Sequence, residues 1–252
     1  MSHPARDDQA TICAIAAIAM IIATFAHEAA GHGSACLIAG GHITQLTSVY
    51  FDCSAMTGLV ALAGPAGNLA AALLGWLALR LLAQAAIRAR LLALLVMALS
   101  AFWAAGYLIY AMLKRHGDYA LAAHELLALP SQVWRPAGVI LGLVLYWVSA
   151  RMIARGARQI VGARAAPVLR TAWVAAGIGA VLAAALYRPD PGGAMVQAAL
   201  EISAASIPLL FLVRRNVVVA PAAPLITCSA GWIAAAVILF AAFAATLGRG
   251  IV

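Results

Sequence analysis

The stretch TFAHEAAGHGSA, residues 24–35, sets two histidines and a glutamate within an otherwise apolar run. His27 and His32 offer imidazole nitrogens that can bind zinc, and Glu28 is a carboxylate that could take a proton from a metal-bound water. The usual zinc-protease signature separates its histidines by four residues, which places them about 40° apart on an α-helix. Here they are five residues apart, and a regular helix would turn them about 140° from each other.

The extra residue predicts a deformed helix between the two histidines. A π-bulge would realign them, and such bulges concentrate at functional sites. Gly31, immediately before His32, is a natural place for the backbone to deform. The alternative is that both histidines are polar residues bridging neighbouring helices, with Glu28 paired to an arginine. Polar contacts between membrane helices are, however, more often made by Ser, Thr or Asn.

A zinc site needs a third protein ligand, and the chain has only eight acidic residues. The candidates are Asp52, Asp118, Glu125 and Glu201. The spans before Asp118, in the segment KRHGDYALAAHELL, place it on the same side of the membrane as His32, as a shared site requires. Asp52 is expected on that side too, in the segment after the first helix.

Composition sets the context of these residues. With 65% hydrophobic and 10% charged residues in a chain of 252, there is more apolar surface than one soluble core could hide. Apolar runs that reach the length of about 20 residues needed to cross a bilayer recur along the chain. We therefore expect an all-α polytopic membrane protein with six or seven transmembrane helices. The expected spans cover residues 10–38, 58–84, 91–113, 137–154, 168–187, 193–213 and 225–247.

Three segments around these spans carry further expectations. The sixth span contains Glu201 and Pro208 and should be broken or half-buried. Residues 40–57, rich in β-branched and aromatic residues, predict a short hairpin or re-entrant segment after the first helix. In GPAGN, Gly64 and Pro65 are expected to break the second span at its start.

Asn68 is the strongly polar side chain of the second span. It could orient a peptide carbonyl or stabilise an oxyanion. The alternative is a proline in the first turn of the helix, with Asn68 bonding a neighbouring helix.

The net charge of +8 does not indicate nucleic-acid binding, because the arginines are not gathered in a basic domain. They sit in short loops at helix ends, as the positive-inside rule describes. With seven spans, 11 basic residues fall on the N-terminal side and 5 on the other, which predicts a cytoplasmic N-terminus. The larger group comprises Arg6, Arg80, Arg88, Arg90, Arg151, Arg155, Arg158, Arg164, Arg170, Arg214 and Arg215. The smaller group comprises Lys114, Arg115, Arg135, Arg188 and Arg249.

The four cysteines, Cys13, Cys36, Cys53 and Cys228, are scattered. Those in or beside apolar spans are expected to be small buried hydrophobes. The spacing suggests neither a thiolate metal site nor a redox compartment.

HEAAGH, GPAGN and GDYA resemble, in order and kind, the three signatures of the site-2 protease family of intramembrane zinc metallopeptidases. The resemblance covers roughly residues 20–125. It implies that His27, His32 and Asp118 bind Zn²⁺, that Glu28 is the general base or acid, and that Asn68 supports the substrate or transition state. The chain departs from the family in the longer histidine spacing and in Tyr119, which stands where a glycine commonly follows the aspartate. The longer H-E-x-x-x-H spacing itself is similar to that of the soluble dipeptidyl peptidase III family.

The resemblance implies hydrolysis of peptide bonds in or near transmembrane segments of membrane proteins. A metalloprotease core is expected over residues 1–125, with additional transmembrane helices over 126–252. The expected partners are a membrane-protein substrate with a transmembrane segment and the lipid bilayer, with no nucleic acid. The expected location is a bacterial inner membrane, spanned several times.

The substrate helix must unwind before cleavage. Residues 43–51 and Gly64 to Gly67 are expected to hold the unwound chain. The alternative function is a non-proteolytic protein of the same fold, either a metal-binding carrier or an inactive partner-binding homologue. His116, His124 and Glu125 near Asp118 favour the carrier. A structural membrane subunit is a third possibility.

Overall fold

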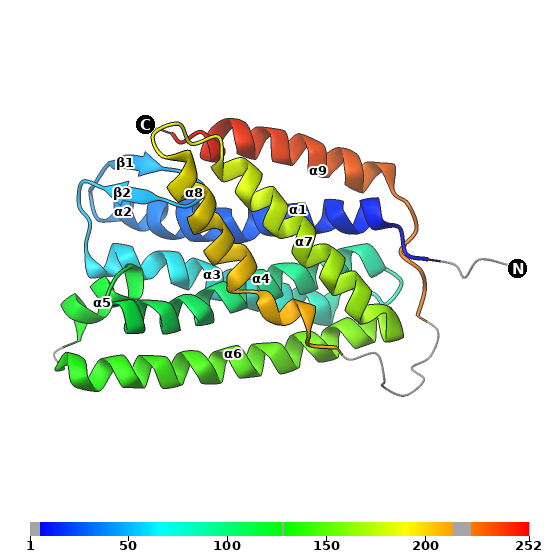
Figure 1. Ribbon diagram of the computed structural model, residues 1–252, viewed down its shortest axis with the longest axis horizontal. Helices are drawn as coiled ribbons and strands as arrows, with labels where there is room; N and C mark the ends of the chain where they lie inside the picture. Colours follow the sequence, from blue (N-terminus) through cyan, green and yellow to red (C-terminus); the bar gives the residue numbers. More distant parts are fainter. Residues whose placement is uncertain (1–5, 128, 214–222, 252) are drawn as a thin grey trace, which may run out of the picture.

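The computed structural model describes residues 6–127, 129–213 and 223–251, and most of them are helical. Long helices run side by side along one axis, with the two chain termini towards opposite ends (Figure 1). Five helical stretches of this part of the chain are long and apolar enough to cross a membrane. They are Gln9–Ile38, Gly58–Leu81, Ile87–Lys114, Ser131–Ala184 and Ala230–Gly248. By length and composition, the expected helical membrane protein is therefore confirmed in outline.

The first span is one continuous helical rod of three parts. Helix α1 (Gln9–Phe25) begins where the Asp8 carboxylate accepts the Thr11 amide hydrogen. It passes into a π-helix, η1 (Ala26–Gly33), and then into the short helix α2 (Ser34–Ile38). Helix α1 packs against α3, α4, α7 and α9, so this rod lies at the centre of the bundle.

The next helices form the layer that faces the π-helix. These are α3 (Gly58–Leu81), α4 (Ile87–Lys114) and α5 (Asp118–Leu126). Helix α3 begins after Thr57, whose hydroxyl accepts the Val60 amide hydrogen, and it continues through Pro65. The expected break at Gly64 and Pro65 is therefore wrong. A proline removes one backbone hydrogen bond, and the packing of α3 on η1 and α4 keeps the helix continuous.

A hairpin follows the first span, as expected. Strand β1 (Ile43–Leu46) pairs antiparallel with β2 (Phe51–Cys53), and Leu46 also bridges Ile251 near the C-terminus. Between the strands, the Thr47 hydroxyl accepts the Val49 and Tyr50 amide hydrogens and closes the turn. The strand-like segment expected over residues 43–51 is thus the first strand and the turn of this hairpin.

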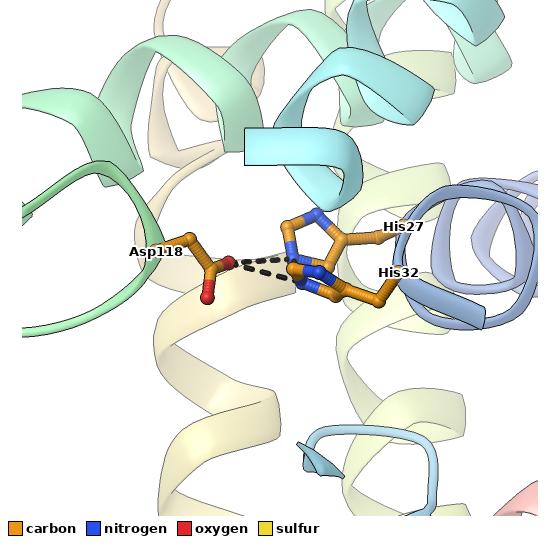
Figure 2. A group of neighbouring side chains, drawn as sticks. All are labelled: His27, His32 and Asp118. Atoms are coloured by element: carbon orange, nitrogen blue, oxygen red, sulfur yellow. Dashed lines mark hydrogen bonds and ion pairs between the residues drawn. The ribbon is translucent and has the colours of Figure 1, made fainter. Parts of the chain in front are cut away.

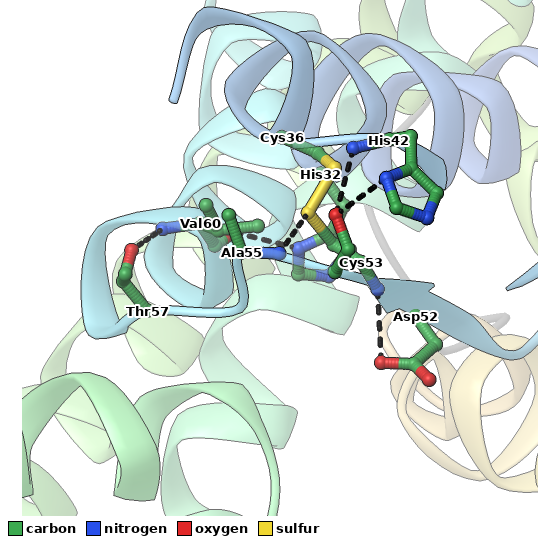
Figure 3. Close-up of a disulfide and its surroundings, with 9 residues drawn as sticks. His32, Cys36, His42, Asp52, Cys53, Ala55, Thr57 and Val60 are labelled. Carbon is green, nitrogen blue, oxygen red and sulfur yellow. Dashed lines mark hydrogen bonds between the residues drawn. A yellow bond between two sulfur atoms is a disulfide. The ribbon is translucent and has the colours of Figure 1, made fainter. Parts of the chain in front are cut away.

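A disulfide between Cys36 and Cys53 ties the hairpin to the end of α2 (Figure 3). It corrects the expectation that Cys36 is an unpaired small hydrophobe. The two cysteines are 17 residues apart in sequence, and their pairing depends on the hairpin folding back onto the helix. Cys13 and Cys228 are free and exposed, so the expectation that they are buried is wrong.

The remaining helices surround this core. The 54-residue apolar stretch is divided into two helices that turn back at Gly162–Arg164. They are α6 (Ser131–Val161) and α7 (Ala165–Ala184). The expected sixth span is indeed broken: α8 (Pro191–Ala198) passes into a π-helix, η3 (Ala199–Ala204), and then a 3-10 turn, η4 (Ile207–Leu210). The last helix is α9 (Ala230–Phe243), extended by η5 (Ala244–Gly248).

Candidate metal centre

His27 and His32 face the same point because the helix that carries them is a π-helix. In η1 each backbone N–H bonds the fifth residue before it, so residues five apart lie one turn apart on one face. The two Nε2 atoms are 3.2 Å apart, and both side chains are buried. The predicted bulge between the histidines is confirmed.

Asp118 reaches the two rings from the opposite side, at the start of α5 (Figure 2). The turn before it depends on Gly117, whose φ of 92° favours glycine. The Asp118 amide then donates a hydrogen bond of 3.0 Å to the Tyr107 hydroxyl on α4. This turn brings the carboxylate Oδ2 to 3.2 Å from both Nε2 atoms.

These three atoms have the separations that a zinc ion requires. A tetrahedral zinc with bonds of about 2.0–2.1 Å to N and O ligands holds its ligand atoms roughly 3.3 Å apart. All three pairs among His27 Nε2, His32 Nε2 and Asp118 Oδ2 are 3.2 Å apart. Two histidines and one carboxylate also form a donor set that suits zinc and leaves a fourth position for water.

Asp118 also has the charge state that a ligand needs. Burial alone would raise the pKa of its carboxyl, but hydrogen bonds with His27 and His32 outweigh burial and lower the pKa to about 2. The group is therefore an anion at neutral pH.

His32 is oriented by three neighbours. Its Nδ1–H donates a hydrogen bond of 2.8 Å to the Val60 carbonyl, which leaves Nε2 directed at the cluster. Phe51 of β2 stacks on the ring at a centroid distance of 5.1 Å. Gly64 lies against the ring, and a Cβ there would overlap the imidazole.

His27 is held between Trp103 and Asn68. Trp103 stacks on it at 4.5 Å with an interplanar angle of 7°, and the Asn68 amide nitrogen lies 3.0 Å from Nδ1. The Asn68 Oδ1 atom is buried and has no partner among the described residues. A half-turn of this amide would let Oδ1 accept a hydrogen bond from Nδ1–H, the tautomer that leaves His27 Nε2 free for a metal.

Asn68 therefore makes the contact given as the alternative, a bond to a neighbouring helix. It is fully buried, and its amide contacts His27. In this position it holds the ring of a candidate metal ligand.

The glycines of the second span serve close packing. A Cβ at Gly67 would overlap the Ala26 carbonyl oxygen, and one at Gly31 would overlap the Ala63 carbonyl oxygen. The idea that Gly64 to Gly67 hold an unwound substrate is wrong, because this face of α3 is filled by η1. The spacing of small residues in GPAGN was the sequence signal for this close approach.

Glu28 is buried on the same π-helix as the two histidines, and its carboxylate makes no hydrogen bond with any residue that the structure describes. The other candidate ligands are engaged elsewhere. Asp52 accepts the Cys53 amide hydrogen, Glu125 accepts that of Gly58, and Glu201 accepts a hydrogen bond from Gln197. Among these alternatives, only Asp118 joins the two histidines.

The aromatic contacts of Phe51, Trp103 and Tyr107 were not found by sequence reasoning, since their partners lie on other elements. Comparisons of the chain with protein-family models, with curated proteins and with solved structures found no match. The functional argument is therefore built on the site itself.

Proposed function

We propose that this protein is an intramembrane zinc metallopeptidase that hydrolyses peptide bonds in or near transmembrane segments of membrane proteins. The observation that carries the proposal is that Asp118 of α5 meets His27 and His32 of the first apolar span, with the three candidate ligand atoms 3.2 Å apart. The resemblance of HEAAGH, GPAGN and GDYA to the site-2 protease signatures supports the same function.

Each part of the reaction has a residue suited to it. A zinc ion held by His27, His32 and Asp118 would activate water and polarise a peptide carbonyl. Glu28 would accept the proton of the attacking water and deliver it to the leaving amine. Its carboxylate has no hydrogen-bond partner among the described residues, so it is free for this transfer. Asn68, Trp103 and Phe51 would keep the two rings in place.

Substrate would bind in an extended form, because the backbone amides of an intact helix are already hydrogen-bonded. In the described structure β1 contacts both β2 and Ile251, whereas β2 pairs with β1 alone. The outer edge of β2 is thus the open edge of the hairpin. It could pair with an unwound substrate strand next to Phe51, which stacks on His32.

We further propose that the metal end of the bundle faces the oxidising side of a bacterial inner membrane, with six or seven crossings and a cytoplasmic N-terminus. The Cys36–Cys53 disulfide lies at this end, and disulfides persist on oxidising sides of membranes. The arginines expected at the other end support the same orientation. Of these, Arg214 and Arg215 lie outside the described residues.

A metal-binding carrier is the second candidate function. It is favoured by a cavity of about 560 Å³ that Asp118 lines together with His116 and His124. Such a cavity could also deliver water or zinc to a peptidase site, so its presence alone does not separate the two functions.

The experiment that tests the proposal compares zinc content and cleavage in one preparation. Purified wild-type protein is expected to carry one zinc and to cleave a single-span model peptide in lipid nanodiscs. Glu28→Gln should keep the zinc and lose at least about a hundredfold in cleavage rate. Asp8→Asn, which alters a carboxylate at the start of α1 and keeps an N-capping side chain there, is the matched control.

Cleavage that survives Glu28→Gln would contradict the proposal, as would wild-type protein without zinc. Zinc flux across liposomes without peptide cleavage would indicate the carrier.

A further inference from the structure

A cavity of about 360 Å³ lies between α4, α6 and the π-helix η3, next to the metal centre. Two of its lining residues also contact that centre. Trp103 stacks on His27, and the Tyr107 hydroxyl accepts the Asp118 amide hydrogen. A group bound in the cavity would therefore lie one aromatic ring away from the candidate ligands.

The walls of the cavity are mainly aromatic and aliphatic, and they include Tyr110 and Tyr146. The Tyr146 hydroxyl is engaged, since it donates a hydrogen bond of 2.7 Å to the Ala205 carbonyl. Among the lining residues, Glu201 is the one carboxylate, and it lies beside Gln197; the Trp103 Nε1–H is also left without a partner among the described residues. Apolar walls with one or two converging polar groups are the usual form of a small binding pocket.

Glu201 is incompletely paired. Its Oε1 accepts a hydrogen bond of 2.7 Å from Gln197, while its Oε2 is buried and has no partner among the described residues. No basic side chain of the described chain forms an ion pair with it. A buried carboxylate in a membrane protein is costly and marks a functional position.

A further observation singles out Glu201. It lies on a π-helical turn, as His27 and His32 do, and such turns concentrate at functional sites. Its unpaired Oε2 atom leaves one oxygen to accept a hydrogen bond from a bound group.

We propose that this cavity is a specificity pocket for a lysine or arginine side chain of the substrate, with Glu201 as the residue that selects it. The inference rests on the proposed peptidase function. The aliphatic stem of such a side chain would pack on the apolar walls, and its cationic head would lie over the aromatic rings and meet Glu201.

Binding to the inactive Glu28→Gln variant tests the proposal without any cleavage. Fluorescent single-span peptides are titrated in lipid nanodiscs, with lysine moved one position at a time along the peptide. Each is matched by a peptide with norleucine, which has a similar stem and no charge. Lysine is expected to bind about tenfold tighter than norleucine at one position or one short window.

Substitutions of Glu201 in the Glu28→Gln variant then test whether the preference for lysine over norleucine comes from the pocket. Glu201→Gln, which keeps the shape of the side chain, should reduce the preference to less than about twofold. Glu201→Asp keeps the charge and should retain part of it, which separates charge from packing. Asp8→Asn, which keeps an N-capping side chain on α1 and does not line the cavity, should leave the preference unchanged.

The pocket proposal is overturned if no position prefers lysine, or if the preference is the same with Glu201→Gln. A cleavage assay distinguishes failure of the pocket proposal from failure of the proposed peptidase function. If wild-type protein cleaves the norleucine peptides and Glu28→Gln does not, the peptidase stands and only the pocket falls. If no peptide is cleaved, both proposals fall.

Discussion

His32 fits beside α3 because position 64 carries no side chain. The Gly64 backbone contacts the imidazole, and the Val60 carbonyl four residues earlier fixes its Nδ1–H. The geometry of the candidate metal centre thus depends on residues that are not themselves candidate ligands. The Gly64 backbone and the Val60 carbonyl set the direction of His32 Nε2. In histidines that bind metals, the other ring nitrogen is commonly held by such a hydrogen bond.

The substitution Gly64→Ala is expected to lower zinc affinity by about 10- to 100-fold, the usual effect of disturbing groups that orient a ligand. The added Cβ would overlap the His32 ring and force it away from Asp118. Zinc titration with a competing chelator measures the change. Gly231→Ala is the control, since a Cβ there meets nothing within 4 Å. Equal zinc affinity in both variants would refute this account of Gly64.

Replacing Asp118 by alanine is expected to abolish stoichiometric zinc, because it removes the one anionic ligand of the cluster. Asp52→Asn should keep a full complement of zinc, since Asp52 bonds only its own turn. Elemental analysis of the purified variants gives the metal content. Full zinc in Asp118→Ala would show that the third ligand lies elsewhere.

At the scale of elements, the π-helix and the hairpin act together. The π-helix aligns His27 with His32, and Cys36, four residues further on, holds the hairpin through Cys53. Phe51 lies two residues before Cys53 and stacks on His32. The disulfide therefore fixes the strand that covers the metal centre.

Breaking this disulfide is expected to destabilise the protein and loosen the centre. Closing a loop of 17 residues is worth about 3 kcal/mol in unfolding free energy. Cys53→Ser should lower Tm, and a reductant should lower the Tm of wild-type protein but leave that of Cys53→Ser unchanged. The control is Cys13→Ser, which alters a free cysteine and should keep the reductant effect. A reductant-insensitive Tm in wild-type protein would count against the bond.

On the scale of the whole molecule, the spans after residue 126 are part of the same scaffold. One hydrophobic cluster joins side chains from α1 and α4 to those of α6, α7 and α9. The hairpin, α2 and α5 gather at one end of the bundle, and the N-terminus lies at the other (Figure 1). This polarity gives the proposed orientation a direct test.

Labelling with a membrane-impermeant maleimide is expected to distinguish the two ends. In spheroplasts, a cysteine placed at the exposed position 42 beside the hairpin (His42→Cys) should be labelled from outside. Cys228, which lies just before α9 at the N-terminal end, should react only after the membrane is permeabilised. Mass spectrometry of the labelled peptides reports the sites. Labelling of Cys228 in intact spheroplasts would reverse the orientation.

The sequence by itself indicated a helical chain with spans apolar enough to cross a membrane, a hairpin after the first span and the two histidines of the candidate centre. Long apolar runs can hide only in a bilayer or a helical core, and a five-residue histidine spacing requires a deformed helix if both rings are to meet. It also indicated the broken segment around Glu201, because a charged residue and a proline interrupt an otherwise apolar run.

Only the tertiary structure decided how these pieces meet. The pairing of Cys36 with Cys53, the contact of Asn68 with His27 and the choice of Asp118 over other acids depend on elements far apart in sequence. The rule that proline breaks a helix also failed for α3, which continues through Pro65. Packing of α3 against η1 and α4 compensates for the hydrogen bond that the proline removes. Local sequence limits the shape of each segment, whereas the partners of each side chain follow from how the segments pack.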